Sequence, residues 1–259
     1  MIDIGVNLTN TRFAKDLPEV LARAQQVGVR QMMVTGTNVT ESQQAVELCQ
    51  QFPEYLTATA GVHPHDAANV SDDYLEQLSK LAQQQSVRAI GECGLDFNRN
   101  FSPPEQQISV FTEQVELASS LKLPLFLHQR DAFEQWLAIL KPYVSKIPAM
   151  VSHCFTGNTA QMKSCLEHGM YIGITGWVCD ERRGHELQEA VKHLPLDKLM
   201  IETDAPYLTP RTIRPKPKSS RNEPAYLPYV VETIAQLKQV TAEQVIAASV
   251  ANSQRVFGL

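Results

Sequence analysis

Residues 87–128 read VRAIGECGLDFNRNFSPPEQQISVFTEQVELASSLKLPLFLH. A short apolar run lies near each end, at 87–91 and 123–127, and an amphipathic segment at 104–121 separates the two runs. Ser102-Pro103-Pro104-Glu105 is typical of a helix start, because it combines a capping box with proline at the first helical position. A strand, a helix and a second strand in this order form a unit with parallel strands. We therefore predict one βαβ unit in this stretch.

The same alternation runs along the whole chain. Near-continuous apolar runs, typical of strands covered on both faces, predict strands at 2–6, 31–35, 57–62, 87–91, 123–127, 149–153, 170–174 and 198–202. Amphipathic segments predict helices at 16–27, 40–51, 72–85, 104–121, 131–142, 158–168, 184–193, 226–238 and 242–255. Further capping boxes are expected at Thr40–Gln43 and Thr241–Gln244. Eight repeats favour a (β/α)8 TIM barrel, as a single domain over 1–259, with a doubly wound open sheet as the alternative.

Composition excludes several classes of protein. The chain of 259 residues is 43% hydrophobic and 20% charged, which suits a globular protein and excludes a disordered one. Its 23 Lys and Arg against 28 Asp and Glu give a net charge of −5, which excludes a general basic coat for duplex DNA. Five cysteines without a C-x-x-C pair indicate neither a disulfide framework nor a cysteine zinc site. No signal peptide or membrane span is recognisable, so we expect a cytoplasmic protein.

Histidines and acidic residues recur where the predicted strands end. These residues are His63, Glu92, His128, His153 and Asp204, and His65 follows closely after the first of them. The carboxyl ends of barrel strands carry the active site, so these side chains point at one shared volume. Imidazole nitrogens and carboxylate oxygens are ligands for divalent metals. A metal site is therefore predicted, although any one of these histidines taken alone suits a buried structural role equally well.

Several longer stretches carry a family resemblance. They are GVHPH (61–65), GECGLDF (91–97), PLFLHQRDA (124–132), SHCFTG (152–157) and LPLDKLMIETDAP (194–206). Together they resemble the TatD family of metal-dependent nucleases, which belongs to the wider amidohydrolase-type barrels. DIGVNLT (3–9) and ITGWVCDERRG (174–184) resemble the bacterial members in particular. The matching stretches span most of the chain in the order of the family.

The resemblance implies roles for individual residues. Glu92, His128 and His153 would bind the divalent metal, and Asp204 would be a further ligand and the base that activates water. Glu92 and Asp204 are thus the expected catalytic residues. Residues expected against the substrate phosphate or around the ligands are His63, His65 and Arg130, with Asp96 helping to shape the pocket. Glu202 either orients a ligand or makes a buried structural hydrogen bond.

The first predicted strand departs from the family pattern. Most members open with D-x-H-x-H, whereas this chain keeps Asp3 but has Gly5 and Asn7 in place of the two histidines. Neither glycine nor a neutral amide replaces imidazole as a strong ligand. We therefore expect one or two ions, of which one is well held and the second weak. The loss of nitrogen ligands favours Mg²⁺, with Mn²⁺ as the other candidate.

A basic segment follows the last predicted strand. Residues 211–221, RTIRPKPKSSR, contain Arg211, Arg214, Lys216, Lys218 and Arg221 and no acidic residue. Because the segment follows the strand that carries Asp204, we expect it to contact a phosphate backbone. A solvated charged loop is the alternative. Trp177 is expected either to stack on an unpaired base or to pack in the core.

The sequence thus predicts a hydrolase of phosphodiester bonds. The resemblance supplies the substrate, DNA or RNA with single-stranded ends, and the direction, a 3′–5′ exonuclease. We expect a monomer that has no membrane partner. One alternative is another hydrolase on the same barrel, such as a deacylase of mischarged tRNA or a small amide or ester hydrolase. A second alternative is a non-enzymatic binding protein with a decayed site.

Overall fold

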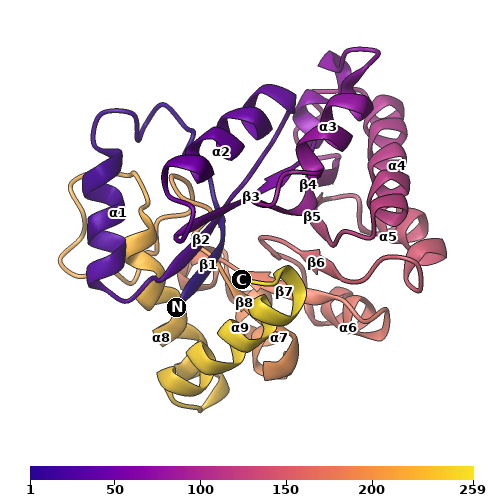
Figure 1. Ribbon diagram of the computed structural model, residues 1–259. Coiled ribbons are helices and arrows are strands. Elements are labelled where there is room, and N and C mark those ends of the chain that lie inside the picture. Colours follow the sequence, from indigo (N-terminus) through magenta and orange to yellow (C-terminus); the bar gives the residue numbers. More distant parts are fainter. The chain divides into compact units, whose positions relative to one another are not determined.

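The computed structural model describes residues 1–259, and eight strands alternate with helices along them (Figure 1). The strands are β1 (Ile2–Val6), β2 (Gln31–Val34), β3 (Leu56–Ala60), β4 (Val87–Asp96), β5 (Leu125–Arg130), β6 (Met150–Ser152), β7 (Tyr171–Ile174) and β8 (Leu199–Ile201). The helices are α1 (Leu17–Gln26), α2 (Val39–Gln51), α3 (Tyr74–Ala82), α4 (Pro104–Leu121), α5 (Phe133–Leu140), α6 (Thr159–Glu167), α7 (His185–His193), α8 (Leu227–Lys238) and α9 (Ala242–Phe257). Short 3₁₀ helices are η1 (Pro64–Asn69), η2 (Lys141–Tyr143), η3 (Gly176–Cys179), η4 (Leu196–Lys198) and η5 (Pro224–Tyr226).

The order of the strands in the sheet follows their order in the chain, from β1 to β8. The pairs β3–β4, β4–β5, β5–β6 and β7–β8 are parallel. A doubly wound sheet would reverse its strand order at a switch point, so that alternative is wrong. The fold is the predicted (β/α)8 TIM-barrel class. None of the helices combines the length and apolar character that a membrane span requires.

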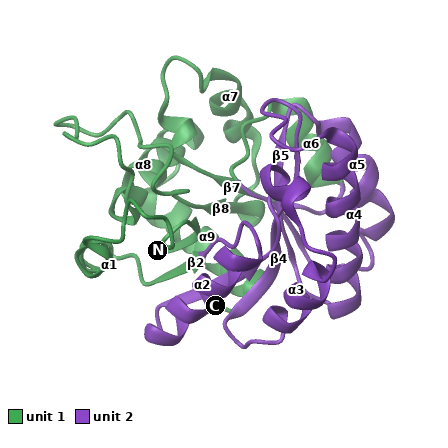
Figure 2. Cartoon of the chain, turned by 90° about the horizontal axis from the view of Figure 1, so that it is seen from above, with its two compact units in different colours: residues 1–33, 154–167, 171–259 green, residues 34–153, 168–170 purple.

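The chain divides into two compact units (Figure 2). Unit 1 contains residues 1–33, 154–167 and 171–259. Unit 2 contains residues 34–153 and 168–170. The expectation of a single domain over 1–259 stays a prediction.

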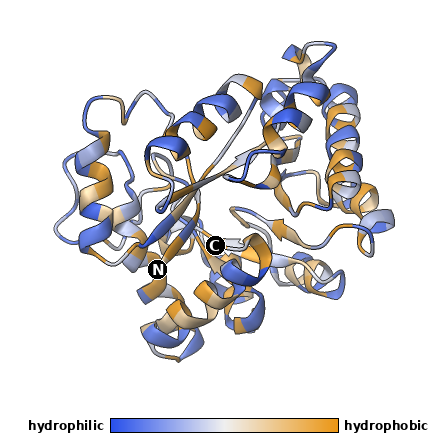
Figure 3. Cartoon of the chain, in the orientation of Figure 1, coloured by the Kyte–Doolittle hydropathy of each residue, from blue (hydrophilic) through white to orange (hydrophobic).

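Unit 2 is built on apolar contacts between its strands and helices. Figure 3 shows α4 with both hydrophobic and hydrophilic stretches, as expected for a helix with one buried face. One buried cluster joins α2, α3 and α4 to β3, β4 and η1, and its members are Val46, Ala60, Val62, Ala67, Tyr74, Leu78, Leu81, Val87 and Val110. This packing holds η1, which carries His65, against the strands.

Two of the three predicted helix caps differ in the structure. Helix α4 has the predicted bounds, but the hydroxyl of Ser102 donates to the carbonyl of His65 and does not cap the helix. Helix α2 is capped by Asn38, which accepts from the backbone N–H of Glu41, so the box predicted at Thr40 is wrong. The capping box of α9 at Thr241 is present as predicted.

Strand β4 is longer than the sequence predicts. It continues five residues past the predicted end at 91, so Glu92 lies inside the strand and does not close it. Its pairing with β5 shifts register between Gly91 and Cys93 and then continues to Asp96. The apolar run breaks at Glu92, which is why the hydropathy pattern alone ends the strand too early.

In unit 1, hydrogen bonds join β1 and the residue after it to the residues that follow β8. The N–H of Asp204 donates to the carbonyl of Gly5, and the N–H of Asn7 donates to the carbonyl of Ala205, each at 2.8 Å. The buried carboxylate of Asp3 accepts from the N–H of Thr203 at 2.9 Å and from its hydroxyl at 2.5 Å. Burial raises the pKa of Asp3 from 3.8 to about 7 against these hydrogen bonds.

We expect Gly94→Ala to destabilise the protein strongly. The backbone of Gly94 has φ of +152°, and an added Cβ would lie 1.8 Å from the carbonyl oxygen of His128. Steric overlap and backbone strain together should lower the free energy of unfolding by about 3 kcal/mol, measured by urea denaturation. Gly28→Ala is the matched control, because Gly28 also has a positive φ but has no atom within 4 Å of the added Cβ. The control should lose only about 1 kcal/mol, and equal losses would refute the steric argument.

Asp3→Asn should change how stability depends on pH. Because folding raises the pKa of Asp3 to about 7, the native state holds this proton more tightly than the unfolded chain. The resulting stabilisation is complete below about pH 4 and is lost as pH rises to about 7, at roughly 1.4 kcal/mol per pH unit. Relative to the wild type, the variant should therefore become progressively more stable from pH 4 to pH 7. Urea denaturation of chelator-treated protein measures this, and a difference that stays constant with pH contradicts it.

Candidate metal centre

The candidate site in unit 2 is assembled from four neighbouring strands. Glu92 lies in β4 and His128 in β5, His153 directly follows β6, and His63 follows β3 after Gly61 and Val62. The backbone of Glu92 is fixed by its N–H, which donates to the carbonyl of Gly36 at 2.8 Å. The close approach of β4 and β5 at Gly94 brings Glu92 and His128 together.

Three imidazole nitrogens converge on one carboxylate oxygen. Oε1 of Glu92 lies 3.0 Å from Nδ1 of His128 and 3.5 Å from Nε2 of His63. The same oxygen lies 3.5 Å from Nε2 of His153. The Glu92 side chain is only 7% exposed and that of His153 1%. The predicted grouping of Glu92, His128 and His153 is therefore present, and His63 joins it as a fourth donor.

The charges in this cluster are set by burial and by the neighbouring rings. Burial tends to raise the pKa of Glu92, but the positive potential of His153, His63 and His128 outweighs it and holds the pKa well below the ordinary range. Burial lowers the pKa of His63 to about 3, against the opposing effect of Glu92. The neighbouring carboxylates of Asp96 and Glu92, in contrast, raise the pKa of His128 against the effect of burial. The cluster thus combines a carboxylate with imidazoles, which are donor groups that bind divalent metals.

His128 supplies an independent indication that the cluster fits a metal ion. Its Nε2 is buried and makes no hydrogen bond, since Oδ2 of Asp96 lies 3.6 Å away, and buried polar atoms are rarely left in this state. Donor atoms of His63, Glu92 and His128 all lie within 4.8 Å of one another. A single divalent cation can therefore be shared by these three side chains, and their mixed nitrogen and oxygen donors suit one.

His65 and Asp96 form a second layer around this cluster. Nε2 of His65 lies 2.8 Å from Oδ2 of Asp96, and the same oxygen lies 3.6 Å from Nε2 of His128. Burial tends to raise the pKa of Asp96, but the neighbouring imidazole of His128 and the hydrogen bond from His65 outweigh it and lower the pKa. The N–H of His65 donates to Nδ1 of His63, which leaves Nε2 of His63 directed at Glu92. Asp96 and His65 thus orient the inner imidazoles.

In unit 1, Asp204 follows β8 in a left-handed backbone conformation, with φ of +54°. Its Oδ1 accepts a hydrogen bond from Nδ2 of Asn7 at 3.0 Å. Asn7 stands where the family pattern has a histidine, and its amide holds this carboxylate. Oε1 of the buried Glu202 accepts from the N–H of Cys154 at 2.6 Å, which supports the structural alternative for Glu202.

The five cations of 211–221 fall into two groups. Arg211 pairs with Glu181 at 2.7 Å, and Arg221 pairs with Asp16 at 2.7 Å and with Glu223 at 2.8 Å. The hydrogen bonds from Arg221 lower the pKa of Asp16 to about 2. The other three side chains are exposed and make no ion pair; they are Arg214, Lys216 and Lys218.

Two further aromatic and basic residues were predicted near the substrate. Arg130, the last residue of β5, is exposed and makes no ion pair. Trp177 in η3 is partly buried, and the guanidinium of Arg183 lies 4.4 Å from the centre of its ring. The sequence predicted that this ring stacks on a base or packs in the core, and in the structure it makes a cation–π contact with Arg183.

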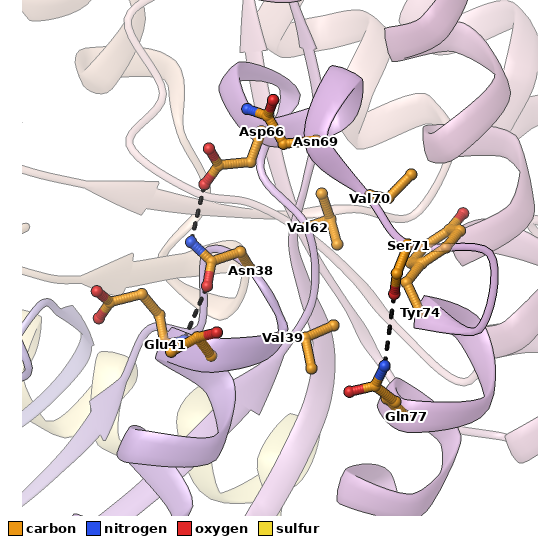
Figure 4. Close-up of a pocket in the computed structure, with 11 residues that line it drawn as sticks. Asn38, Val39, Glu41, Val62, Asp66, Asn69, Val70, Ser71, Tyr74 and Gln77 are labelled. Carbon is orange, nitrogen blue, oxygen red and sulfur yellow. Dashed lines mark hydrogen bonds between the residues drawn. The ribbon is translucent and has the colours of Figure 1, made fainter.

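Unit 2 also has a cavity of about 420 Å³, lined by residues in and around α2, η1 and α3 (Figure 4). Its lining includes Asn38, Glu41, Asp66, Tyr74 and Gln77, and Asn38 donates to Asp66 at 2.9 Å. Two carboxylates and no lysine or arginine line it, so it does not complement a phosphate group.

Comparisons with known proteins agree with this geometry. A family model described as TatD related DNase matches residues 2–258. A protein of Erwinia tasmaniensis named 3′-5′ ssDNA/RNA exonuclease TatD is 52% identical over 259 residues, which is 100% of both chains. The protein of the same name from Salmonella typhimurium is 51% identical over 257 residues, covering 99% of this chain and 98% of the relative.

A solved structure shows the same architecture. The TatD homologue YJJV of Escherichia coli K12 is 28% identical, with a TM-score of 0.91 over 100% of this chain and 98% of that one. The family match covers nearly the whole chain, and the relatives align along their full length. The chain therefore belongs to the TatD-related DNase family.

Proposed function

We propose that this chain is a divalent-metal-dependent nuclease that removes nucleotides from the 3′ ends of single-stranded DNA or RNA. The observation that carries the proposal is the convergence of three imidazole nitrogens on Oε1 of Glu92, within 3.5 Å. The substrate comes from relatives of full-length similarity that are named as exonucleases of single-stranded DNA and RNA.

The cluster in unit 2 would hold the metal ion. Glu92, His128 and His153 are the proposed ligands, and the position of His63 supports adding it to them. A divalent ion there would lower the pKa of water and stabilise charge on the phosphate in the transition state. Mg²⁺ and Mn²⁺ are the proposed ions.

Asp204 is the proposed general base. Its carboxylate would take a proton from the attacking water, and the amide of Asn7 supports this role by holding Oδ1 in a fixed direction. Asn7 and Gly5 cannot supply the imidazoles of the family pattern, so we propose one tightly held ion and a second, weaker one. His65 would orient the inner imidazoles through Asp96, Arg130 would contact the phosphate, and the exposed cations of 211–221 would contact the strand beyond it.

Metal removal tests the proposal. Chelation should abolish cleavage of a labelled single-stranded oligonucleotide, and Mg²⁺ or Mn²⁺ should restore it. Glu92→Ala should reduce kcat/KM by about 1000-fold or more, and His65→Ala by about 10- to 100-fold, because Glu92 contacts the ion and His65 acts through Asp96. Calorimetric titration should find metal binding abolished in the first variant and weakened in the second. Full activity after exhaustive chelation would refute the metal mechanism.

The same assay separates the alternatives. Metal-loaded protein should be offered the oligonucleotide, aminoacyl-tRNA, small esters and amides. Cleavage of only the last three classes would identify a deacylase or an amide or ester hydrolase. Metal binding without turnover of any substrate would identify a binding protein.

The exposed cations of the basic loop should govern strand binding. We expect replacement of Arg214, Lys216 and Lys218 by glutamine to raise KM on oligonucleotides. The slope of log affinity against log salt should also become shallower by about 0.7 for each phosphate that the loop no longer neutralises. Hydrolysis of a small chromogenic phosphodiester should be unchanged. The matched control replaces the exposed Lys80, Lys141 and Lys163 by glutamine, which changes the net charge equally. If both triple variants raise KM alike, net charge acts on the strand and the loop does not.

A further inference from the structure

Phe101 is an apolar ring that the fold leaves in water. It is 64% exposed, the highest value among the large hydrophobic side chains, followed by Tyr207 at 49%. Phenylalanine is usually buried, because removing its ring from water stabilises the folded state. Phe101 lies in the segment between β4 and α4, five residues after Asp96.

The segment that carries Phe101 is held rigidly in unit 2. The hydroxyl of the adjacent Ser102 donates to the carbonyl of His65 and accepts from the N–H of Ala68, each at 2.9 Å. The carbonyl of Ser102 accepts from the amide of Gln107 at 2.7 Å. Oδ1 of Asp96 accepts from the N–H of Arg99 at 2.8 Å. The exposed ring is therefore preorganised.

The ring lies directly beside the candidate metal centre. Its centroid is 4.7 Å from that of His65, with an interplanar angle of 74°. His65 in turn contacts the ring of His63 at 4.2 Å and hydrogen-bonds to Asp96. Only one side chain separates Phe101 from the cluster around Glu92.

A guanidinium group accompanies the ring. The Cζ atom of Arg99 lies 6.0 Å from the centroid of Phe101, at the outer limit of a cation–π contact. Arg99 is exposed and makes no ion pair with a carboxylate. An aromatic face with an adjacent unpaired cation matches a nucleotide, whose base stacks and whose phosphate is anionic.

We propose that Phe101 is a specificity-determining residue that stacks on a base next to the scissile phosphate, with Arg99 contacting the adjoining phosphate. This inference rests on the proposed nuclease function and adds to it a base subsite. Every base has a π face, so the subsite accepts all four bases and rejects a nucleotide that has none. It also favours single strands, because bases in a duplex are already stacked on their neighbours.

The test compares Phe101→Ala with the wild type on two oligonucleotides. One is an ordinary single strand, and the other has abasic sites at its last two positions. Loss of stacking should raise KM on the ordinary strand about 5- to 100-fold. The abasic strand should be poor for both proteins and differ little between them. Phe101→Trp should restore binding, and the small chromogenic phosphodiester should be hydrolysed at the same rate by all variants.

A matched control is available on the same unit. Tyr143 in η2 carries Lys146 over its ring at 4.9 Å, and it lies ahead of β6, away from the strand ends that carry the cluster. Tyr143→Ala should leave KM unchanged on both strands. Thermal unfolding of each variant checks that the fold is intact.

Binding to chelator-treated protein gives a readout that does not depend on turnover. An oligonucleotide with 2-aminopurine at its last position should lose fluorescence when the wild type stacks on it, and the loss should disappear in Phe101→Ala. Equal damage to oligonucleotide and chromogenic substrate would overturn the inference, because the ring would then only support His65. Unchanged KM and quenching would overturn it too. Quenching that depends on Phe101 without any strand cleavage would support the subsite and refute the proposed nuclease.

Discussion

The burial of the Glu92 carboxylate is the constraint on which the rest of the site depends. Taking a carboxylate out of water costs several kcal/mol unless positive or hydrogen-bonding groups surround it. Here His63, His128 and His153 provide that environment, and they come from the ends of three other strands. The strands must therefore pair in the correct register, because a shift of one residue would turn these side chains to the other face of the sheet. The rigid (β/α)8 scaffold and the register shift in β4 satisfy this requirement.

Most of the fold could be predicted because its signals are local. Apolar runs and amphipathic segments predicted eight strands and nine helices within a few residues of their observed bounds. The exceptions depend on partners distant in the sequence. The last residues of β4 are a strand only because β5 pairs with them. Ser102 does not cap α4, because its hydroxyl donates to the carbonyl of His65, 37 residues away.

The candidate site divides in the same way. Strand-end reasoning brought Glu92, His128 and His153 together, since topology places such positions near one another, although Glu92 lies inside β4. The same rule placed His63 near the shared volume, but its direction toward Glu92 follows from the 3₁₀ turn in which its Nδ1 accepts from the N–H of His65. The partners of the cations at 211–221 also could not be predicted from the local sequence. Arg221 pairs with Asp16, 205 residues away, and no local pattern shows that this cation anchors the loop.

The charges of this protein act in two different surroundings. Glu92 and its imidazoles are buried, where a low effective dielectric makes each interaction strong and little affected by salt. Arg99, Arg214 and Lys216 are exposed, where salt screens their attraction for phosphate. The overall charge of −5 repels nucleic acid at long range, so in the proposed function exposed cations such as these supply the local attraction. In the proposed function, strand binding is therefore the salt-sensitive step, whereas the interactions within the buried cluster respond little to salt.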